Sequence, residues 1–150
     1  MPPKEKIIKT NDSSLFSESN EAEIILVSPR ELIAHEKVSI LRAIYVLLKM
    51  VLSGQFKVPL LIDSKTKTIL DGHHRSYAAH RLGLKKIPCY CVNYLTDKSI
   101  RVQSRKPDIL VDKERVIKMA LSEKVFPRKT TRHEYKTPKF TSLKLKNLWK

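Results

Sequence analysis

The sequence of 150 residues has few cysteines, few glycines and no long hydrophobic run. Its two cysteines exclude a disulfide-dependent miniprotein. Its longest apolar stretch, residues 43–52, is interrupted by Lys49 and is far shorter than the roughly 20 residues that a membrane span requires. The N-terminus also lacks a hydrophobic signal core, so we expect a cytoplasmic protein that does not cross a membrane.

Acidic residues are scarce and unevenly placed. The chain has 30 basic and 15 acidic side chains and a net charge of +15, and residues 101–150 hold 15 of the basic but only 5 of the acidic ones. A positive field of this kind favours polyanions such as nucleic acid, an anionic membrane or the phosphates of a nucleotide. The sign of the charge alone does not show which of these partners the protein binds.

The pattern of apolar residues predicts a mixed α+β domain over residues 23–150, after a flexible tail over residues 1–22. We expect strands at 23–27, 58–63, 67–70, 87–94 and 100–103, and a final edge strand near the C-terminus. Helices are expected at 36–53, at 73–82 and from Asp112 to about residue 124. The first of these helices has apolar residues at a 3.6-residue period and is expected to be a main core element; these are Ile40, Leu41, Ile44, Leu47, Leu48 and Val51.

The most informative stretch is the run from Asp71 to Arg75, Asp-Gly-His-His-Arg, between a predicted strand and a predicted helix. The start of a helix offers unpaired backbone N–H groups and a partial positive charge, so it can bind phosphate. A carboxylate at Asp71 would repel that phosphate unless a divalent cation lay between them, and Mg²⁺ prefers such oxygen ligands. The alternative is a simple Asp-Gly turn followed by surface histidines.

The segment over residues 69–92 resembles the core motif of the ParB and sulfiredoxin superfamily. Sulfiredoxins carry a catalytic cysteine directly after the glycine, where this chain has His73, so their activity is not expected here. Three motifs in order are similar to those of the free serine kinase branch: His35-Glu36, Asp71 to Arg75, and the segment 127–133 that contains Thr-Thr-Arg-His. The resemblance implies a small ParB/sulfiredoxin-like domain with a mixed sheet flanked by helices. It also implies transfer of the terminal phosphoryl group of ATP or ADP to free L-serine, giving O-phosphoserine for cysteine biosynthesis.

Roles for the motif residues follow from this resemblance and from their chemistry. Glu36 is the expected general base, because the predicted start of a helix would favour its ionised form. Asp71 is the expected Mg²⁺ ligand, and the phosphates would be bound by Gly72, His73, His74 and Arg75. The serine carboxylate or the product phosphate would be bound by Thr130, Thr131, Arg132 and His133.

A second hypothesis is a non-catalytic ParB-like protein that binds nucleotide or nucleic acid through the basic C-terminal third. The two hypotheses differ in whether serine and a divalent metal are required. The sequence leaves the choice of ATP or ADP, the adenine-binding residues and the oligomeric state open.

Overall fold

The computed structural model describes residues 7–8 and 23–150 of the chain. Its three α-helices are α1 (Ile40–Ser53), α2 (His73–Arg81) and α3 (Lys113–Leu121), with short 3₁₀ turns η1 (Pro29–Glu31) and η2 (Leu145–Asn147). Its strands are β1 (Ile7–Ile8), β2 (Glu23–Val27), β3 (Gln55–Phe56), β4 (Leu60–Asp63), β5 (Ile69–Asp71), β6 (Ile87–Val92), β7 (Arg101–Ser104), β8 (Thr131–Glu134) and β9 (Leu143–Lys144). The predicted tail over residues 1–22 lies outside the described residues, except that β1 pairs with β2.

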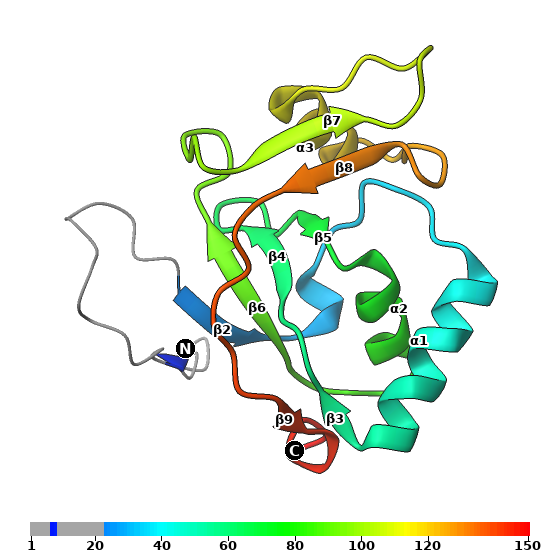
Figure 1. Ribbon diagram of the computed structural model, residues 1–150, viewed down its shortest axis with the longest axis vertical. Helices are drawn as coiled ribbons and strands as arrows, with labels where there is room; N and C mark the ends of the chain where they lie inside the picture. The colour runs from blue at the N-terminus through cyan, green and yellow to red at the C-terminus, as the bar shows by residue number, and fades with distance from the viewer. Residues whose placement is uncertain (1–6, 9–22) are drawn as a thin grey trace.

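A mixed five-stranded sheet with the order β1-β2-β6-β4-β5 forms the centre of the fold (Figure 1). Strand β6 runs antiparallel to β2 and parallel to β4, and β4 forms an antiparallel hairpin with β5. The two-stranded sheets β3-β9 and β7-β8 lie outside it. The predicted α+β class is therefore confirmed.

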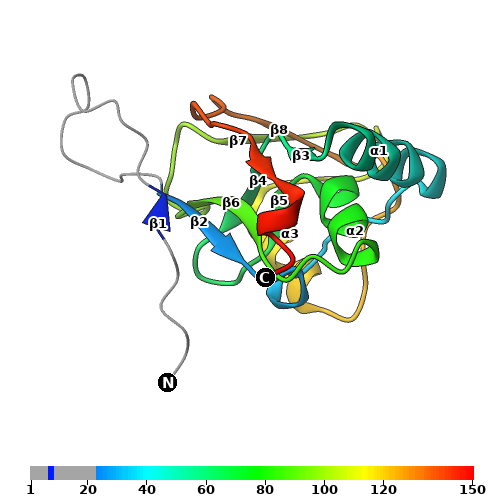
Figure 2. The same ribbon diagram turned by 90° about the horizontal axis from the view of Figure 1, so that it is seen from below.

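Both faces of the central sheet are covered, because successive strand residues point to opposite sides. Leu60 and Ile62 of β4 belong to a core cluster that includes residues of α1, α2 and the C-terminal segment, whereas Leu61 belongs to a second cluster with α3. Viewed from below, α1 and α2 lie on one side of the sheet with the C-terminal segment beside them (Figure 2). Among the described residues, no helix is long and apolar enough to span a membrane.

Helix α1 differs from the prediction in its start and in the side that it buries. It begins at Ile40, because Ser39 caps it by accepting the N–H of Arg42 at 3.4 Å. Its fully buried residues are Ala43 and Met50, and five of the six residues predicted to face the core are exposed: Ile40, Leu41, Ile44, Leu48 and Val51. The expectation that this periodic face packs into the core was therefore wrong. The helix has apolar residues on two faces, and the narrower face packs against α2.

Most other elements agree with the prediction to within a few residues. Gly54 has a φ of +66° and ends α1 as expected, and Asp112 caps α3 by accepting the N–H of Arg115 at 2.8 Å. The prediction missed β8, which runs through the Thr-Thr-Arg-His segment and pairs with β7. It also missed β3, whose partner β9 is the expected C-terminal edge strand.

Candidate functional site

Three segments that are far apart in the sequence meet at the start of α2. Residues 33–39 form isolated bridges with Thr68, just before β5, and with Phe126. Strand β5 leads into α2, and β8 contacts β5 (Figure 1). The fold thus brings together the three sequence motifs around Glu36, Gly72 and Thr131.

The start of α2 has the backbone geometry of an anion-binding helix terminus. Gly72 stands at its N-cap with a φ of +105°, and no side chain caps the helix. A Cβ atom at Gly72 would lie 2.8 Å from Leu60 Cγ and 3.1 Å from Arg75 Nη2, so both conformation and space require glycine. No side chain caps the N–H groups of the first turn, and the helix dipole makes this end of the helix favourable for an anion.

The Glu36 carboxylate is held by the backbone at the start of β8. Its Oε1 atom accepts the N–H groups of Thr130 at 2.8 Å and Thr131 at 2.7 Å, and lies 3.2 Å from Thr131 Oγ1. The prediction that Glu36 stands at the start of a helix was wrong, since α1 begins four residues later. Backbone N–H groups of β8, and not a helix dipole, fix this carboxylate. Among the described residues, none donates a hydrogen bond to the second carboxylate oxygen of Glu36.

His35 is fully buried and connects the Glu36 segment to two strands. Its Nδ1–H donates to the carbonyl of Ile69 at 2.7 Å, and its Nε2 lies 3.0 Å from Thr131 Oγ1. Burial lowers the pKa of His35 to about 4, so the ring is neutral near pH 7. With the proton on Nδ1, Nε2 and Glu36 Oε1 are both acceptors for the Thr131 hydroxyl, which donates its one proton to either of them.

His73 and His74, the first two residues of α2, hold the other side of the Glu36 segment. The Nε2 atom of His73 accepts the N–H of His35 at 3.3 Å, and Nε2 of His74 accepts the N–H of Ser39 at 3.1 Å. Burial is the largest cause that lowers the pKa of both rings, and neighbouring histidines lower that of His73 further. Both rings are therefore neutral near pH 7 and carry their proton on Nδ1. A phosphate at this site would meet N–H donors from these rings but no imidazolium charge.

His133 on β8 faces the same cluster. Its Nε2 lies 2.9 Å from the hydroxyl of the buried Tyr94, and its ring centroid lies 6.0 Å from that of His35. Burial lowers the pKa of His133 to about 3, and burial raises the pKa of Tyr94. Tyr94 therefore stays protonated and donates to a neutral His133.

Asp71 ends β5 directly before Gly72. Its Oδ2 atom accepts the Tyr135 hydroxyl at 2.7 Å and lies 3.7 Å from Arg75 Nη2, and the side chain is 47% exposed. The Nη1 group of Arg75 donates to the carbonyls of Val58 and Pro59, each at 2.8 Å. One end of the Arg75 guanidinium is thus fixed to the backbone, and the other end faces Asp71.

The surroundings of Asp71 fit a magnesium ion that arrives with a nucleotide. Within the described ranges, no group of three or more His, Cys, Asp or Glu side chains is arranged to hold a metal on its own. Mg²⁺ in nucleotide sites is typically held by one or two carboxylates, by water and by the phosphates themselves. A half-exposed carboxylate beside an uncapped helix start matches that ligand set.

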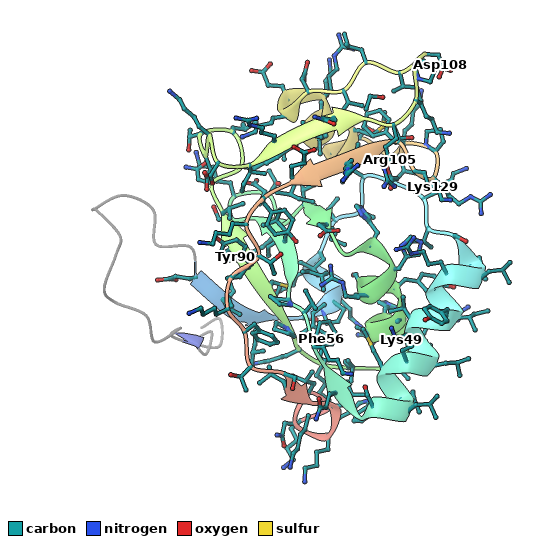
Figure 3. The ribbon with its side chains drawn as sticks, in the orientation of Figure 1. Lys49, Phe56, Tyr90, Arg105, Asp108 and Lys129 are labelled. Carbon is teal, nitrogen blue, oxygen red and sulfur yellow. The ribbon has the colours of Figure 1, made fainter. Side chains whose placement is uncertain are left out.

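The four residues predicted to bind serine occupy different positions. Thr131 and His133 are half-buried and, by strand alternation, share the face of β8 that meets His35. Arg132 is exposed on the opposite face. Thr130 is buried, and its hydroxyl donates to the Pro127 carbonyl at 2.6 Å. The turn before β8 contains Lys129, with a φ of +57°, and the N–H of Arg105 donates to the Thr130 carbonyl at 2.7 Å (Figure 3).

Two tyrosines of the site were not selected from the sequence. Tyr135 follows the Thr-Thr-Arg-His segment and shares the spacing of two residues that joins Thr131 to His133, so recognition of β8 as a strand would have found it. Tyr94 lies after β6 and has no local sequence signal that separates it from an ordinary core tyrosine.

The comparisons with known proteins agree with this architecture. No protein-family model matches the chain. A ParB-like protein from Sulfolobus acidocaldarius is 38% identical over 72 residues, which are 48% of this chain and 36% of that protein. The match therefore spans little more than a third of the length of this curated relative.

Solved structures share the fold over most of the chain. A conserved hypothetical protein from Pyrococcus furiosus has a TM-score of 0.76 and 16% identity, with 86% of this chain and 98% of that chain covered. A free serine kinase in complex with AMP has a TM-score of 0.76 and 15% identity, with 87% and 95% covered. A variant of free serine kinase with alanine in place of a glutamate, in complex with ADP, has a TM-score of 0.75 and 14% identity, with the same coverage. The ParB/sulfiredoxin-like fold expected from the motifs is therefore confirmed, and its structural neighbours include nucleotide complexes of free serine kinase.

Proposed function

We propose that the chain is a magnesium-dependent free L-serine kinase that uses ATP or ADP and forms O-phosphoserine. The observation that carries the proposal is the position of Glu36. Its carboxylate is fixed by the N–H groups of Thr130 and Thr131, at the start of β8, in a segment that His73 and His74 hold against the uncapped start of α2. An ionised base next to a phosphate-binding helix terminus is what phosphoryl transfer to a hydroxyl requires. Free serine kinase structures with the same fold and with AMP or ADP bound support the nucleotide as donor.

The start of α2 takes the phosphate chain in this proposal. Backbone N–H groups at Gly72, His73, His74 and Arg75 bind the oxygens of the transferred phosphoryl group and its neighbour. Asp71 would hold Mg²⁺ against the phosphates, where such an ion would supply neutralisation of the charge that develops on them. Arg75 contributes through Nη2, because Nη1 is already bonded to the backbone.

The second oxygen of the Glu36 carboxylate orients the serine hydroxyl and takes its proton. The serine oxygen forms a bond to the terminal phosphorus, while the bond from that phosphorus to the bridging oxygen breaks. ADP leaves when ATP is the donor, and AMP leaves when ADP is the donor. The Thr131 hydroxyl and His133 are the residues of the predicted serine site that lie nearest to Glu36 and His35. Thr130 offers only its backbone N–H, which Glu36 occupies, and Arg132 lies on the outer face of β8, opposite Thr131 and His133.

The second candidate function is a non-catalytic ParB-like protein that binds nucleotide or nucleic acid. The 38% identity to a ParB-like protein and the excess of basic residues in positions 101–150 favour it. Binding to duplex DNA would weaken with salt with a slope near 0.9 per neutralised phosphate. Phosphoserine formation would instead depend on serine and magnesium.

The test is phosphorus NMR of the protein with serine, Mg²⁺ and either ATP or ADP. We expect a phosphoserine resonance that grows with time, is lost without Mg²⁺ or serine, and identifies the donor. Glu36→Gln provides the matched control, because glutamine keeps the oxygen that accepts the β8 N–H groups but removes the base. Nucleotide binding without phosphoserine from either donor would refute the kinase proposal and favour the non-catalytic alternative.

A further inference from the structure

Helix α1 exposes an apolar face that the site does not use. Seven of its 14 residues are large apolar side chains at least 47% exposed; we call these the α1 stripe: Ile40 (53%), Leu41 (83%), Ile44 (47%), Tyr45 (60%), Leu48 (52%), Val51 (49%) and Leu52 (87%). Figures 1 and 2 show α1 at the margin of the molecule, outside α2. Within the part of the chain that the structure describes, nothing buries this stripe.

The stripe has the spacing of a helix–helix seam. Leu41 and Leu48 are seven residues apart and occupy a positions of a heptad. Ile44 and Val51 each follow one of them by three residues and occupy the d positions. Tyr45 and Leu52 widen the stripe, whereas the residues that α1 buries in its own domain lie on another side of the helix. The pattern holds for two heptads, the full length of α1.

The charged residues of α1 lie off this seam. Arg42 and Lys49 each follow an a position by one residue, which turns them about 100° away from it. The Lys49 ammonium group lies 5.3 Å from the centroid of the Tyr45 ring (Figure 3). The helix has no acidic residue. A partner helix would therefore meet apolar side chains at the a and d positions, with the Lys49 charge beside them over the Tyr45 ring.

The exposed area of the stripe is an upper limit on the apolar area that one partner could bury through it. At about 200 Å² for a fully exposed large side chain, the seven residues expose roughly 800 Å². The largest apolar patch on a typical monomer covers about 300–600 Å², whereas one partner in a standard interface buries about 800 Å².

We propose that α1 packs against α1 of a second copy of this chain across a two-fold axis. A seam of repeating apolar residues without charge is complementary to itself, as a two-fold interface requires. A membrane-surface helix would instead turn a polar face rich in Lys and Arg to water, but the other side of α1 packs against α2.

Sedimentation velocity of the full chain over about 1 to 100 µM tests the interface. We expect a dimer of two 17.4 kDa chains, with a dissociation constant inside this range. Leu48→Glu, at the middle of the stripe, should weaken dimerisation at least a hundredfold. Leu121→Glu makes the same change at a 61% exposed leucine of α3 and should leave the dimer intact. An unchanged circular dichroism spectrum and melting temperature would show that each variant is folded.

A mixing experiment ties the result to this face. Leu48→Glu and Leu48→Lys should each be monomeric, and an equimolar mixture should regain the dimer because opposite charges meet across the seam. A wild-type chain that stays monomeric at about 100 µM would overturn the proposal. So would a monomer that instead binds vesicles of anionic lipid through the stripe, or a dimer that Leu121→Glu disrupts and Leu48→Glu does not. None of these results depends on kinase activity, so the interface can fail while the proposed function holds.

Discussion

The three α-helices in the described part of the chain begin in two different ways. α1 and α3 start at Ser39 and Asp112, and each of these side chains accepts an N–H group from its own first turn. α2 starts at Gly72, with a left-handed backbone and no side-chain cap. A cap stabilises a helix by about 1 kcal/mol, so α2 forgoes a stabilisation that the other two have. In the proposed function, the N–H groups that this cap would take are the ones that bind the phosphates.

The side chains around the start of α2 are buried or half-buried, whereas those at the start of α3 are mostly exposed. Neutral buried histidines and a carboxylate fixed by backbone N–H groups lie around the start of α2. At the start of α3, Asp112 is exposed and pairs with Arg115, whose guanidinium lies 3.4 Å away. The start of α3 thus serves stability alone, and changes at the two helix starts should have separable effects.

The largest effect is expected at Glu36. Glu36→Gln should lower kcat by about 10² to 10⁴, because it removes the base and keeps the oxygen bonded to Thr130 and Thr131. Nucleotide affinity, measured by calorimetry, should stay within a few fold of wild type. Glu114→Gln, in the exposed first turn of α3, is the matched control and should leave kcat unchanged. Loss of nucleotide binding in a folded Glu36→Gln protein would make Glu36 a binding residue and not the base.

The next largest effect on turnover is expected for Asp71→Asn. We expect turnover to fall at least a hundredfold, about 2.7 kcal/mol of transition-state stabilisation, because the charge that holds Mg²⁺ is lost. The hydrogen bond from Tyr135 can be kept by the asparagine oxygen. Asp112→Asn at the start of α3 retains an N-cap oxygen and should change neither turnover nor melting temperature. Normal activity of Asp71→Asn at limiting magnesium would remove Asp71 from the metal site.

The buried histidines predict a pH dependence of stability. Between about pH 6.5 and pH 4, His35 and His133 are neutral in the folded chain but become protonated in the unfolded chain. The unfolded state then binds more protons, so the free energy of unfolding should fall as the pH falls through this window. Urea titrations at several pH values measure this slope. His133→Gln should reduce it, whereas His80→Gln, on the exposed side of α2, should leave it as it is; equal slopes for all three proteins would contradict the account.

The smallest effects are expected on the free energy of unfolding, at the glycine before α2 and the glycine after α1. Gly72→Ala should lower the free energy of unfolding by roughly 1–3 kcal/mol, because the residue has a φ of +105° and its Cβ would meet Leu60 Cγ at 2.8 Å. Gly54→Ala at the end of α1 has the same kind of strain but open space around it, so it should cost about 1 kcal/mol. Chemical denaturation of the two variants measures the difference. An equal cost at both positions would show that the close approach at Gly72 is absorbed by the Leu60 side chain.

Local signals in the sequence predicted most of the fold. The expected helix start at Asp112, the helix directly after Gly72 and the apolar strands around Ile62 and Ile87 agree with the structure to within a few residues. The side that α1 buries could not be predicted, because residues 40–53 are apolar on two faces and periodicity does not tell which one meets the domain. Strand β8 was missed because Thr-Thr-Arg-His reads as a polar loop, and it becomes a strand only through pairing with β7.

The candidate site was predicted as a set of motifs but not as an arrangement. The convergence of Glu36, Gly72 and Thr131 depends on hydrogen bonds between residues more than 30 positions apart. Composition and local spacing do not predict such long-range contacts. The resemblance to free serine kinases identified the three motifs. The expectation that Glu36 lies at the start of a helix was wrong, because α1 begins at Ile40. The roles of the Nε2 atoms of His73 and His74 as acceptors could be found only from the structure.

The central claim is that a nucleotide binds with its phosphates at the uncapped start of α2. Amide resonances of the ¹⁵N-labelled protein, followed while ADP and Mg²⁺ are added, test it most directly. The account predicts that the largest shifts occur at the amides of residues 72–75, with smaller shifts at Glu36 and Thr131, and no change at the start of α3. Shifts confined to the basic residues of the C-terminal third, with residues 72–75 unmoved, would contradict it.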